Sequence, residues 1–192
     1  MGREVTSNWS LIGKDGQRKY LVNGEYEAFM SAVASLKPYQ RAFCETMAGC
    51  GGRISEVLAL RKSDIDRQAG AITLRTLKKK GGKIEHRQVP VSPELITKLD
   101  MVFDLSRGKQ EAKLWNVNVR NARRWVMKAM EAAGLNHPPH ALRHTFGAHC
   151  TGKGIPIGTI RKWMGHSFLD TTTIYTDLCG EEEKELAKRM WR

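Results

Sequence analysis

The stretch from His140 to Tyr175 gathers side chains that are suited to chemistry on a phosphate group. His140 and Arg143 are spaced so that they would project from one face of a helix. His166 follows in a Gly-His pair, and Tyr175 comes nine positions later. An arginine can bind two phosphate oxygens, a histidine can donate or move a proton, and a tyrosine hydroxyl can attack phosphorus. Together, these residue types indicate a phosphoryl-transfer site.

Each of these residues also has a structural explanation when it is taken singly. His140 could cap a helix, His166 could end one, and Tyr175 could be a half-buried aromatic. Arg143 weighs against that view, because an inward-facing arginine needs an anionic partner. His144 points about 100° away from Arg143 on an ideal helix, so we interpret it as a structural hydrogen-bonding group.

A second arginine with a nearby carboxylate precedes this stretch. Arg53 follows Gly51 and Gly52 and stands three residues before Glu56. An arginine at a helix start, directly after a glycine turn, can present its planar guanidinium to a phosphate, and Glu56 could orient it. The alternative is an ordinary ion pair on a helix surface.

Further basic side chains form a lysine run between two strand-like segments, Lys78-Lys79-Lys80-Gly81-Gly82-Lys83. One interpretation is a solvated hairpin tip. The other is a lysine that enters a DNA groove, where it contacts phosphates or donates a proton. Lys80 and Lys83 flank the glycine bend, and Lys80 is the first choice, ahead of Lys83 and Lys79.

The elements that must position these residues are mostly helical. Asn23 is expected to cap the first helix, and apolar side chains at helical spacing predict the others. The expected helices begin at Pro38, Arg53 and Pro93 or span 116–133, 141–153, 156–164, 170–178 and 181–190. The helix that begins at Arg53 is expected to end at 63–66. Alternating β-formers at 71–75 and 88–91 predict an antiparallel hairpin. The fold class is therefore α+β, predominantly α-helical, with a small antiparallel β-sheet.

Charge favours nucleic acid as the partner, because 32 Lys+Arg stand against 20 Asp+Glu for a net charge of +12. A helix over 116–133 would bury Val119 and carry four basic residues, which either contact the DNA backbone or form a solvated face. They are Arg120, Arg123, Arg124 and Lys128. The four cysteines lack zinc-ligand spacing, and no apolar run is long enough to span a bilayer. We expect a cytoplasmic, nucleoid-associated protein without a metal or a membrane segment.

Taken in chain order, these motifs resemble the catalytic domain of the tyrosine recombinases, the phage-integrase family of site-specific DNA recombinases. The resemblance covers most of the chain, and five segments carry it: 51–60, 80–90, 140–146, 164–167 and 172–175. It implies a tyrosine-recombinase catalytic domain that cuts and rejoins DNA without metal, ATP or any other cofactor.

The resemblance also assigns roles to individual residues. Arg53 and Arg143 would bind the non-bridging oxygens of the scissile phosphate, and Glu56 would support their geometry. Tyr175 would attack phosphorus and form a 3′-phosphotyrosine, while Lys80 would protonate the leaving 5′-oxygen. The two histidines that would hold the phosphate and assist proton transfer are His140 and His166.

The same resemblance implies double-stranded DNA as the partner, a homo-oligomer forming a tetrameric synapse, and an accessory DNA-bending factor. We expect an N-terminal extension at 1–22, the catalytic domain at 23–178 and, at 179–192, a tail helix that docks in cis or exchanges between protomers. The family usually carries a helical core-binding domain before the catalytic one. The chain is thus either an excised catalytic domain or a naturally short member.

Two other functions remain open at this point. A type IB topoisomerase shares the chemistry but only relaxes supercoils. A DNA-binding regulator that has lost catalysis is the rival from another class, although all the expected side chains are present.

Overall fold

The computed structural model describes residues 11–12, 16, 18–76 and 85–165. Several predictions fall on residues outside these ranges. They concern the helices at 170–178 and 181–190, the hairpin turn, and five candidate site residues: Lys79, Lys80, Lys83, His166 and Tyr175.

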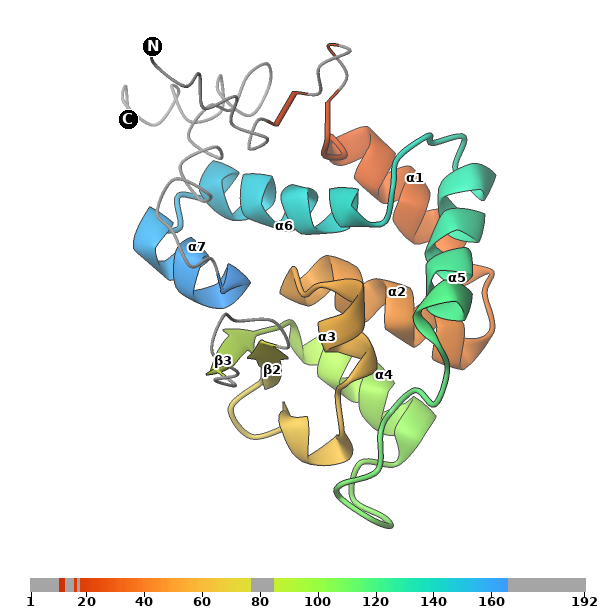
Figure 1. Cartoon of the computed structure of the whole chain (residues 1–192), viewed down its shortest axis with the longest axis vertical. Coiled ribbons are helices and arrows are strands. Elements are labelled where there is room, and N and C mark those ends of the chain that lie inside the picture. Colours follow the sequence, from red (N-terminus) through yellow and green to blue (C-terminus); the bar gives the residue numbers. More distant parts are fainter. Residues whose placement is uncertain (1–10, 13–15, 17, 77–84, 166–192) are drawn as a thin grey trace, which may run out of the picture.

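The described part of the chain contains seven α-helices, with a small sheet at one edge of the helical body (Figure 1). Helix α2 lies at the centre and packs against α1, α4, α5 and α6, while α7 packs against α6 and strand β3. The helices are α1 (Asn23–Ala34), α2 (Pro38–Cys50), α3 (Ile54–Leu58), α4 (Pro93–Phe103), α5 (Val119–Ala132), α6 (His140–Gly152) and α7 (Ile157–Met164), with a 3-10 turn at Lys62–Asp64.

The sheet is antiparallel and has the order β1-β2-β3. Its strands are β1 (Ile65–Asp66), β2 (Ala71–Thr76) and β3 (Glu85–Pro90). The predicted antiparallel pairing of the two later strands, β2 and β3, is confirmed, whereas β1 was missed because its two residues were assigned to the end of the preceding helix. A two-residue strand is too short to show an alternating pattern, so only its pairing with β2 reveals it.

Three details of the helices differ from the predictions. Asn23 is the first helical residue rather than the cap, and Glu25 accepts a hydrogen bond from the N–H of Val22 at 2.9 Å. Helix α3 ends at Leu58, which makes it shorter than expected. Val119 was predicted to be buried but is 47% exposed, because it occupies the first turn of α5, before the helix reaches the core.

The core forms where α2 meets its neighbours. The ring of Phe43 packs edge-on against Trp115 and Trp125, with centroid separations of 5.2 and 5.6 Å. Such edge-to-face pairs add about 0.5–1.5 kcal/mol each to the free energy of burial.

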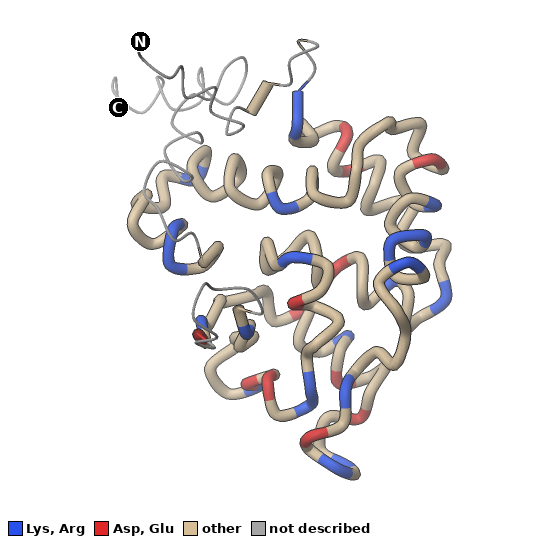
Figure 2. The backbone as a smooth tube through the Cα atoms, in the orientation of Figure 1, with Lys and Arg blue, Asp and Glu red and all other residues tan. Residues whose placement is uncertain are grey.

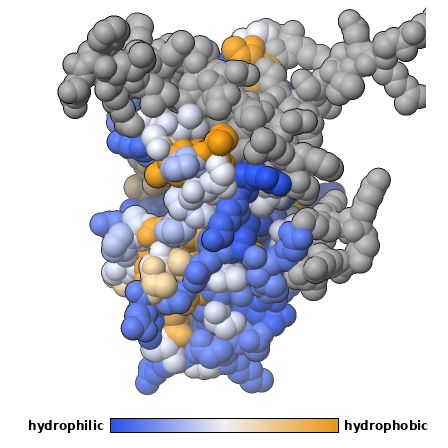
Figure 3. Space-filling model, turned by 90° about the vertical axis from the view of Figure 1, so that its left-hand side faces the viewer, coloured by the Kyte–Doolittle hydropathy of each residue, from blue (hydrophilic) through white to orange (hydrophobic). Residues whose placement is uncertain are grey.

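The outer face that carries α7 and β3 is largely hydrophilic where described atoms are visible (Figure 3).

The turn between α2 and α3 depends on a glycine. Pro38 begins α2, where its missing N–H costs nothing, and Gly51 ends the helix with a positive φ of 60°. A Cβ atom on Gly51 would lie only 2.5 Å from the ring of Phe146 on α6. Both the backbone angle and the close approach of α6 therefore require glycine here.

Within the described ranges, no helix is long and apolar enough to cross a membrane. Cys44, Cys50 and Cys150 are buried free thiols. Burial raises the pKa of the Cys44 thiol to about 12, so that it stays protonated.

Candidate active site

Arg53 stands at the start of α3 and is held there by Glu56. The carboxylate of Glu56 accepts the backbone N–H of Arg53 at 2.8 Å and its Nη1 at 3.0 Å. Glu56 is only 2% exposed, whereas the Arg53 side chain is 43% exposed. The pair is thus no ordinary surface ion pair, because a buried carboxylate fixes an arginine that still faces solvent.

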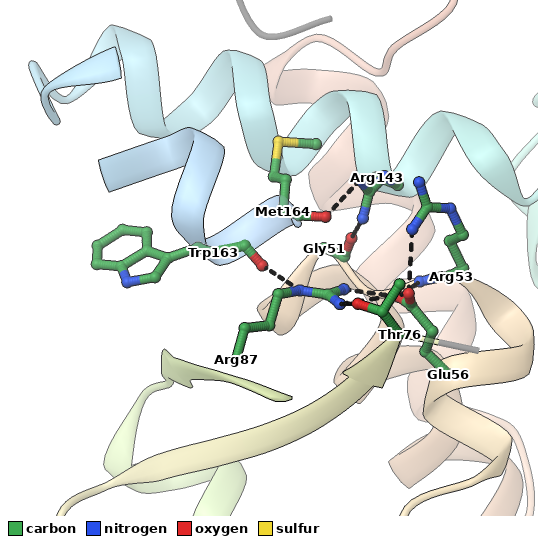
Figure 4. Close-up of polar contacts among 8 residues, drawn as sticks. All are labelled: Gly51, Arg53, Glu56, Thr76, Arg87, Arg143, Trp163 and Met164. Atoms are coloured by element: carbon green, nitrogen blue, oxygen red, sulfur yellow. Dashed lines mark hydrogen bonds and ion pairs between the residues drawn. The ribbon is translucent and has the colours of Figure 1, made fainter. Parts of the chain in front are cut away.

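Arg143 reaches the same region from α6 and is buried, with 2% of its surface exposed. Its Nη1 donates to the carbonyl oxygen of Gly51 at 2.7 Å, and its Nη2 donates to that of Met164 at 2.6 Å. Figure 4 shows this side chain between the turn that precedes Arg53 and the end of α7. Arg143 therefore joins three segments that are distant in the sequence.

His140 completes the group at the start of α6. Desolvation by the surrounding protein lowers the pKa of its imidazole, and the positive charges of Arg143 and Arg53 lower it further. The rings of His140 and His144 meet edge-on, with their centroids 4.7 Å apart. The structure therefore brings together Arg53, Arg143 and His140, three of the predicted site residues, and places His144 beside them.

His144 makes stability depend on pH. Burial, followed by the charges of His140 and Arg143, lowers the pKa of His144 to about 3 from an ordinary value of 6.5. The unfolded chain therefore binds the proton more readily than the folded chain, and acid favours unfolding. We expect this histidine to reduce the free energy of unfolding below pH 6.5, by up to about 1.4 kcal/mol per pH unit.

Urea unfolding of the parent chain and of His144→Gln, measured at pH 7, 6 and 5, tests this expectation. The variant should lose less stability per pH unit than the parent, because its amide does not titrate in this range. Equal losses in the two proteins would show that His144 does not carry the acid sensitivity.

The sequence analysis missed Arg87 on β3. This arginine is 7% exposed, and its Nη2 donates to Oε2 of Glu56 at 2.6 Å. A signal was available, because Arg87 and Val89 alternate on the buried face of β3. An arginine on an apolar strand face requires a carboxylate inside the fold, and Glu56 provides it.

Burial alone would raise the pKa of Glu56, but its hydrogen bonds and ion pairs outweigh that effect. Arg87 and then Arg53 donate to the carboxylate, and together they hold its pKa below the ordinary value. Glu56 is therefore ionised at neutral pH, and its negative charge pairs with both arginines.

The remaining predicted residues are either exposed or outside the described ranges. The basic side chains of α5 are exposed as expected: Arg120, Arg123, Arg124 and Lys128. The lysine run, His166 and Tyr175 lie outside the described residues. Within the described chain, no group of three or more histidine, cysteine, aspartate or glutamate side chains could hold a metal ion.

Comparison with solved structures defines the class of protein. The fold matches the crystal structure of XerA recombinase with a TM-score of 0.76 and 26% sequence identity, over 90% of this chain and 65% of that one. It also matches the catalytic domain of bacteriophage HP1 integrase with a TM-score of 0.67 and 23% identity, over 90% of this chain and 95% of that domain. The fold is that of a recombinase catalytic domain.

The sequence comparisons identify the family. The model of the phage integrase family matches residues 19–182, and the chain belongs to this family. It is 30% identical to the tyrosine recombinase XerA of Pyrococcus furiosus over 89% of this chain and 61% of that protein. It is 36% identical to the tyrosine recombinase XerC of Rhodospirillum centenum over 73% of this chain and 43% of that protein. The chain spans about three fifths of the XerA relatives' length.

Proposed function

We propose that this chain acts as a tyrosine-type site-specific DNA recombinase, with residues 23–178 as its catalytic domain. The observation that carries the proposal is the convergence of two arginines at one turn. Glu56 fixes Arg53 immediately after that turn, and Arg143 binds the carbonyl oxygen of Gly51 within it. Two guanidinium groups anchored this way can stabilise the charge of a pentacovalent phosphate, and His140 lies beside them.

In the proposed reaction, Oη of Tyr175 attacks the scissile phosphorus while the bond from phosphorus to the 5′-oxygen breaks. The tyrosine gives up its proton as it forms the 3′-phosphotyrosine, with His140 and His166 assisting this transfer. Lys80 donates a proton to the leaving 5′-oxygen. Rejoining is the reverse attack by a 5′-hydroxyl, so the phosphodiester energy is kept in the tyrosine link and no ATP is consumed.

Double-stranded DNA is the proposed substrate. Among the structural neighbours, XerH is bound to its difH substrate and the Tn1549 integrase is in complex with transposon DNA. In this chain, Figure 2 shows basic positions along α5, and the net charge of +12 favours a polyanion. We further propose a tetrameric synapse, an accessory DNA-bending factor and a tail at 179–192 that docks on the same or a neighbouring protomer.

If the exposed basic residues of α5 contact DNA phosphates, they should contribute to the salt dependence of DNA binding. Each phosphate contact that is lost should reduce the slope of log K against log salt concentration by about 0.9. Replacing Arg120, Arg123 and Arg124 with Gln should therefore weaken binding to a duplex and flatten the slope, as measured by fluorescence anisotropy. The same slope in the variant and the parent would identify this face of α5 as merely solvated.

A cleavage-trapping assay tests the proposed function. In a suicide duplex, a nick near the cleavage site lets the short fragment that carries the new 5′-hydroxyl diffuse away, so that rejoining is prevented. A protein–DNA adduct that resists SDS should then accumulate. Adduct formation supports strand cleavage, whereas DNA binding without an adduct would favour a regulator that has lost catalysis. A two-site recombination assay, compared with plasmid relaxation, then separates a recombinase from a type IB topoisomerase.

A further inference from the structure

One buried guanidinium, that of Arg87, contacts three separate segments of the chain (Figure 4). Its Nε donates to the carbonyl oxygen of Trp163 at 2.7 Å. Its Nη1 lies 3.2 Å from Oγ1 of Thr76 and 3.3 Å from Oε1 of Glu56, and its Nη2 donates to Oε2 of Glu56 at 2.6 Å. All three nitrogens of the Arg87 guanidinium therefore donate hydrogen bonds within the protein.

Each contacted residue stands, in the sequence, within four positions of a residue of the proposed mechanism. Glu56 binds both the backbone and the side chain of Arg53. Thr76 is the last residue of β2, ahead of the lysine run, and Trp163 belongs to the last turn of α7, ahead of His166. The guanidinium of Arg87 thus contacts three segments that the chain brings together only by folding.

The geometry at this position requires an arginine. Lysine carries its three N–H donors on a single nitrogen, so it cannot span a carboxylate, a hydroxyl and a carbonyl that lie around a planar fork. The space is also full, because a Cβ atom on Gly165 would lie 2.9 Å from Nη1 of Arg87. Gly165 ends α7 with a φ of 63°, and Arg87 packs directly against this end of the helix.

We propose that Arg87 is a positioning residue for DNA cleavage, which sets the orientation of Arg53 through Glu56. This inference rests on the proposed function. Arg87 itself is not proposed to bind the phosphate, because four of its five N–H groups are directed to Trp163, Thr76 and the carboxylate of Glu56. Its effect is transmitted by the carboxylate, because each oxygen of Glu56 accepts one hydrogen bond from Arg87 and one from Arg53.

The substitution Arg87→Lys tests the proposal, because it keeps a positive charge beside Glu56 and removes the fork. We expect the single-turnover rate of adduct formation to fall by about 100-fold, the usual scale for a displaced catalytic group. The affinity for DNA should stay close to that of the parent. Rates are to be compared at a temperature where circular dichroism shows both proteins folded, because the lost hydrogen bonds to Thr76 and to the Trp163 carbonyl also lower stability. Arg75→Lys is the matched control, because Arg75 lies on the adjacent strand and pairs with Asp64 at 2.8 Å, outside this network.

A second substrate separates positioning from a general structural role. A methylphosphonate at the cleavage site removes one negative oxygen, so its cleavage depends less on the charge of Arg53. Arg87→Lys should therefore lose much less activity on the methylphosphonate than on the ordinary phosphodiester, each measured relative to the parent chain. Equal losses on the two substrates would overturn the proposal, since a weakened fold would slow both alike.

Two further comparisons keep the result interpretable. If Arg87→Lys does not fold, the double variant Arg87→Met/Glu56→Gln removes both buried charges and should show the same selective loss on the phosphodiester. If the parent chain forms no adduct on any duplex, the proposed function fails and this inference fails with it. If the parent forms the adduct and Arg87→Lys forms it equally fast, only the role of Arg87 is overturned.

Discussion

Replacing Tyr175 with phenylalanine is expected to abolish the SDS-resistant adduct between this chain and a suicide duplex. The substitution removes only the hydroxyl oxygen that would attack phosphorus, and it retains the ring. Loss of a covalent nucleophile lowers a rate by several orders of magnitude, so the adduct should fall by at least about 1000-fold, to background. Binding to the duplex should persist, because the exposed basic residues of α5 are unchanged.

Tyr39→Phe is the matched control, since Tyr39 is an exposed tyrosine that the proposed mechanism does not use. It should form the adduct at the rate of the parent. Equal adduct formation by Tyr175→Phe would assign the nucleophile to another residue. Loss of adduct in both variants would indicate that the assay reports folding rather than chemistry.

The sequence was sufficient for those parts of the fold that depend on local pattern. Apolar spacing located most of the helices, and alternation located β2 and β3, because those patterns repeat over several turns or residue pairs. It failed where the determinant is contact with a distant segment. The strand β1 exists only through its pairing with β2, and Val119 is exposed because α5 meets the core one turn later.

The same division holds for the candidate site. Arg53, Glu56, His140 and Arg143 could be named from motifs, and the structure places them around one turn. Arg87 could not be ranked as a site residue from motifs, because its importance arises from contacts with residues on α3, β2 and α7. An arginine in the buried register of a strand was the available signal.

Arg143→Ala is the second variant for which a large effect is expected, and here two effects must be separated. Truncation would leave the carbonyl oxygens of Gly51 and Met164 without their hydrogen bonds from Arg143 inside the fold. Losing the buried guanidinium should cost roughly 3–5 kcal/mol of unfolding free energy. For a chain of this size, that corresponds to a melting temperature about 10 °C lower, measurable by circular dichroism.

Adduct formation should also disappear in Arg143→Ala, because the scissile phosphate loses one of its two proposed arginine ligands. Leu142→Ala is the control for the stability effect, since Leu142 is the adjacent residue on α6 and is fully buried. Its truncation should cost a similar amount, about 2–5 kcal/mol, without removing a charge. Both variants should be assayed at a temperature where circular dichroism shows them folded.

Under those conditions, Leu142→Ala should retain the adduct and Arg143→Ala should not. If folded Arg143→Ala formed the adduct as fast as Leu142→Ala, Arg143 would be a structural residue that only joins α6, α7 and the turn at Gly51. The hydrogen bonds of Arg143 fit both roles, because the two carbonyl oxygens that it binds also fix its guanidinium beside Arg53 and His140. Stability and cleavage are therefore expected to fall together in Arg143→Ala and to separate in Leu142→Ala.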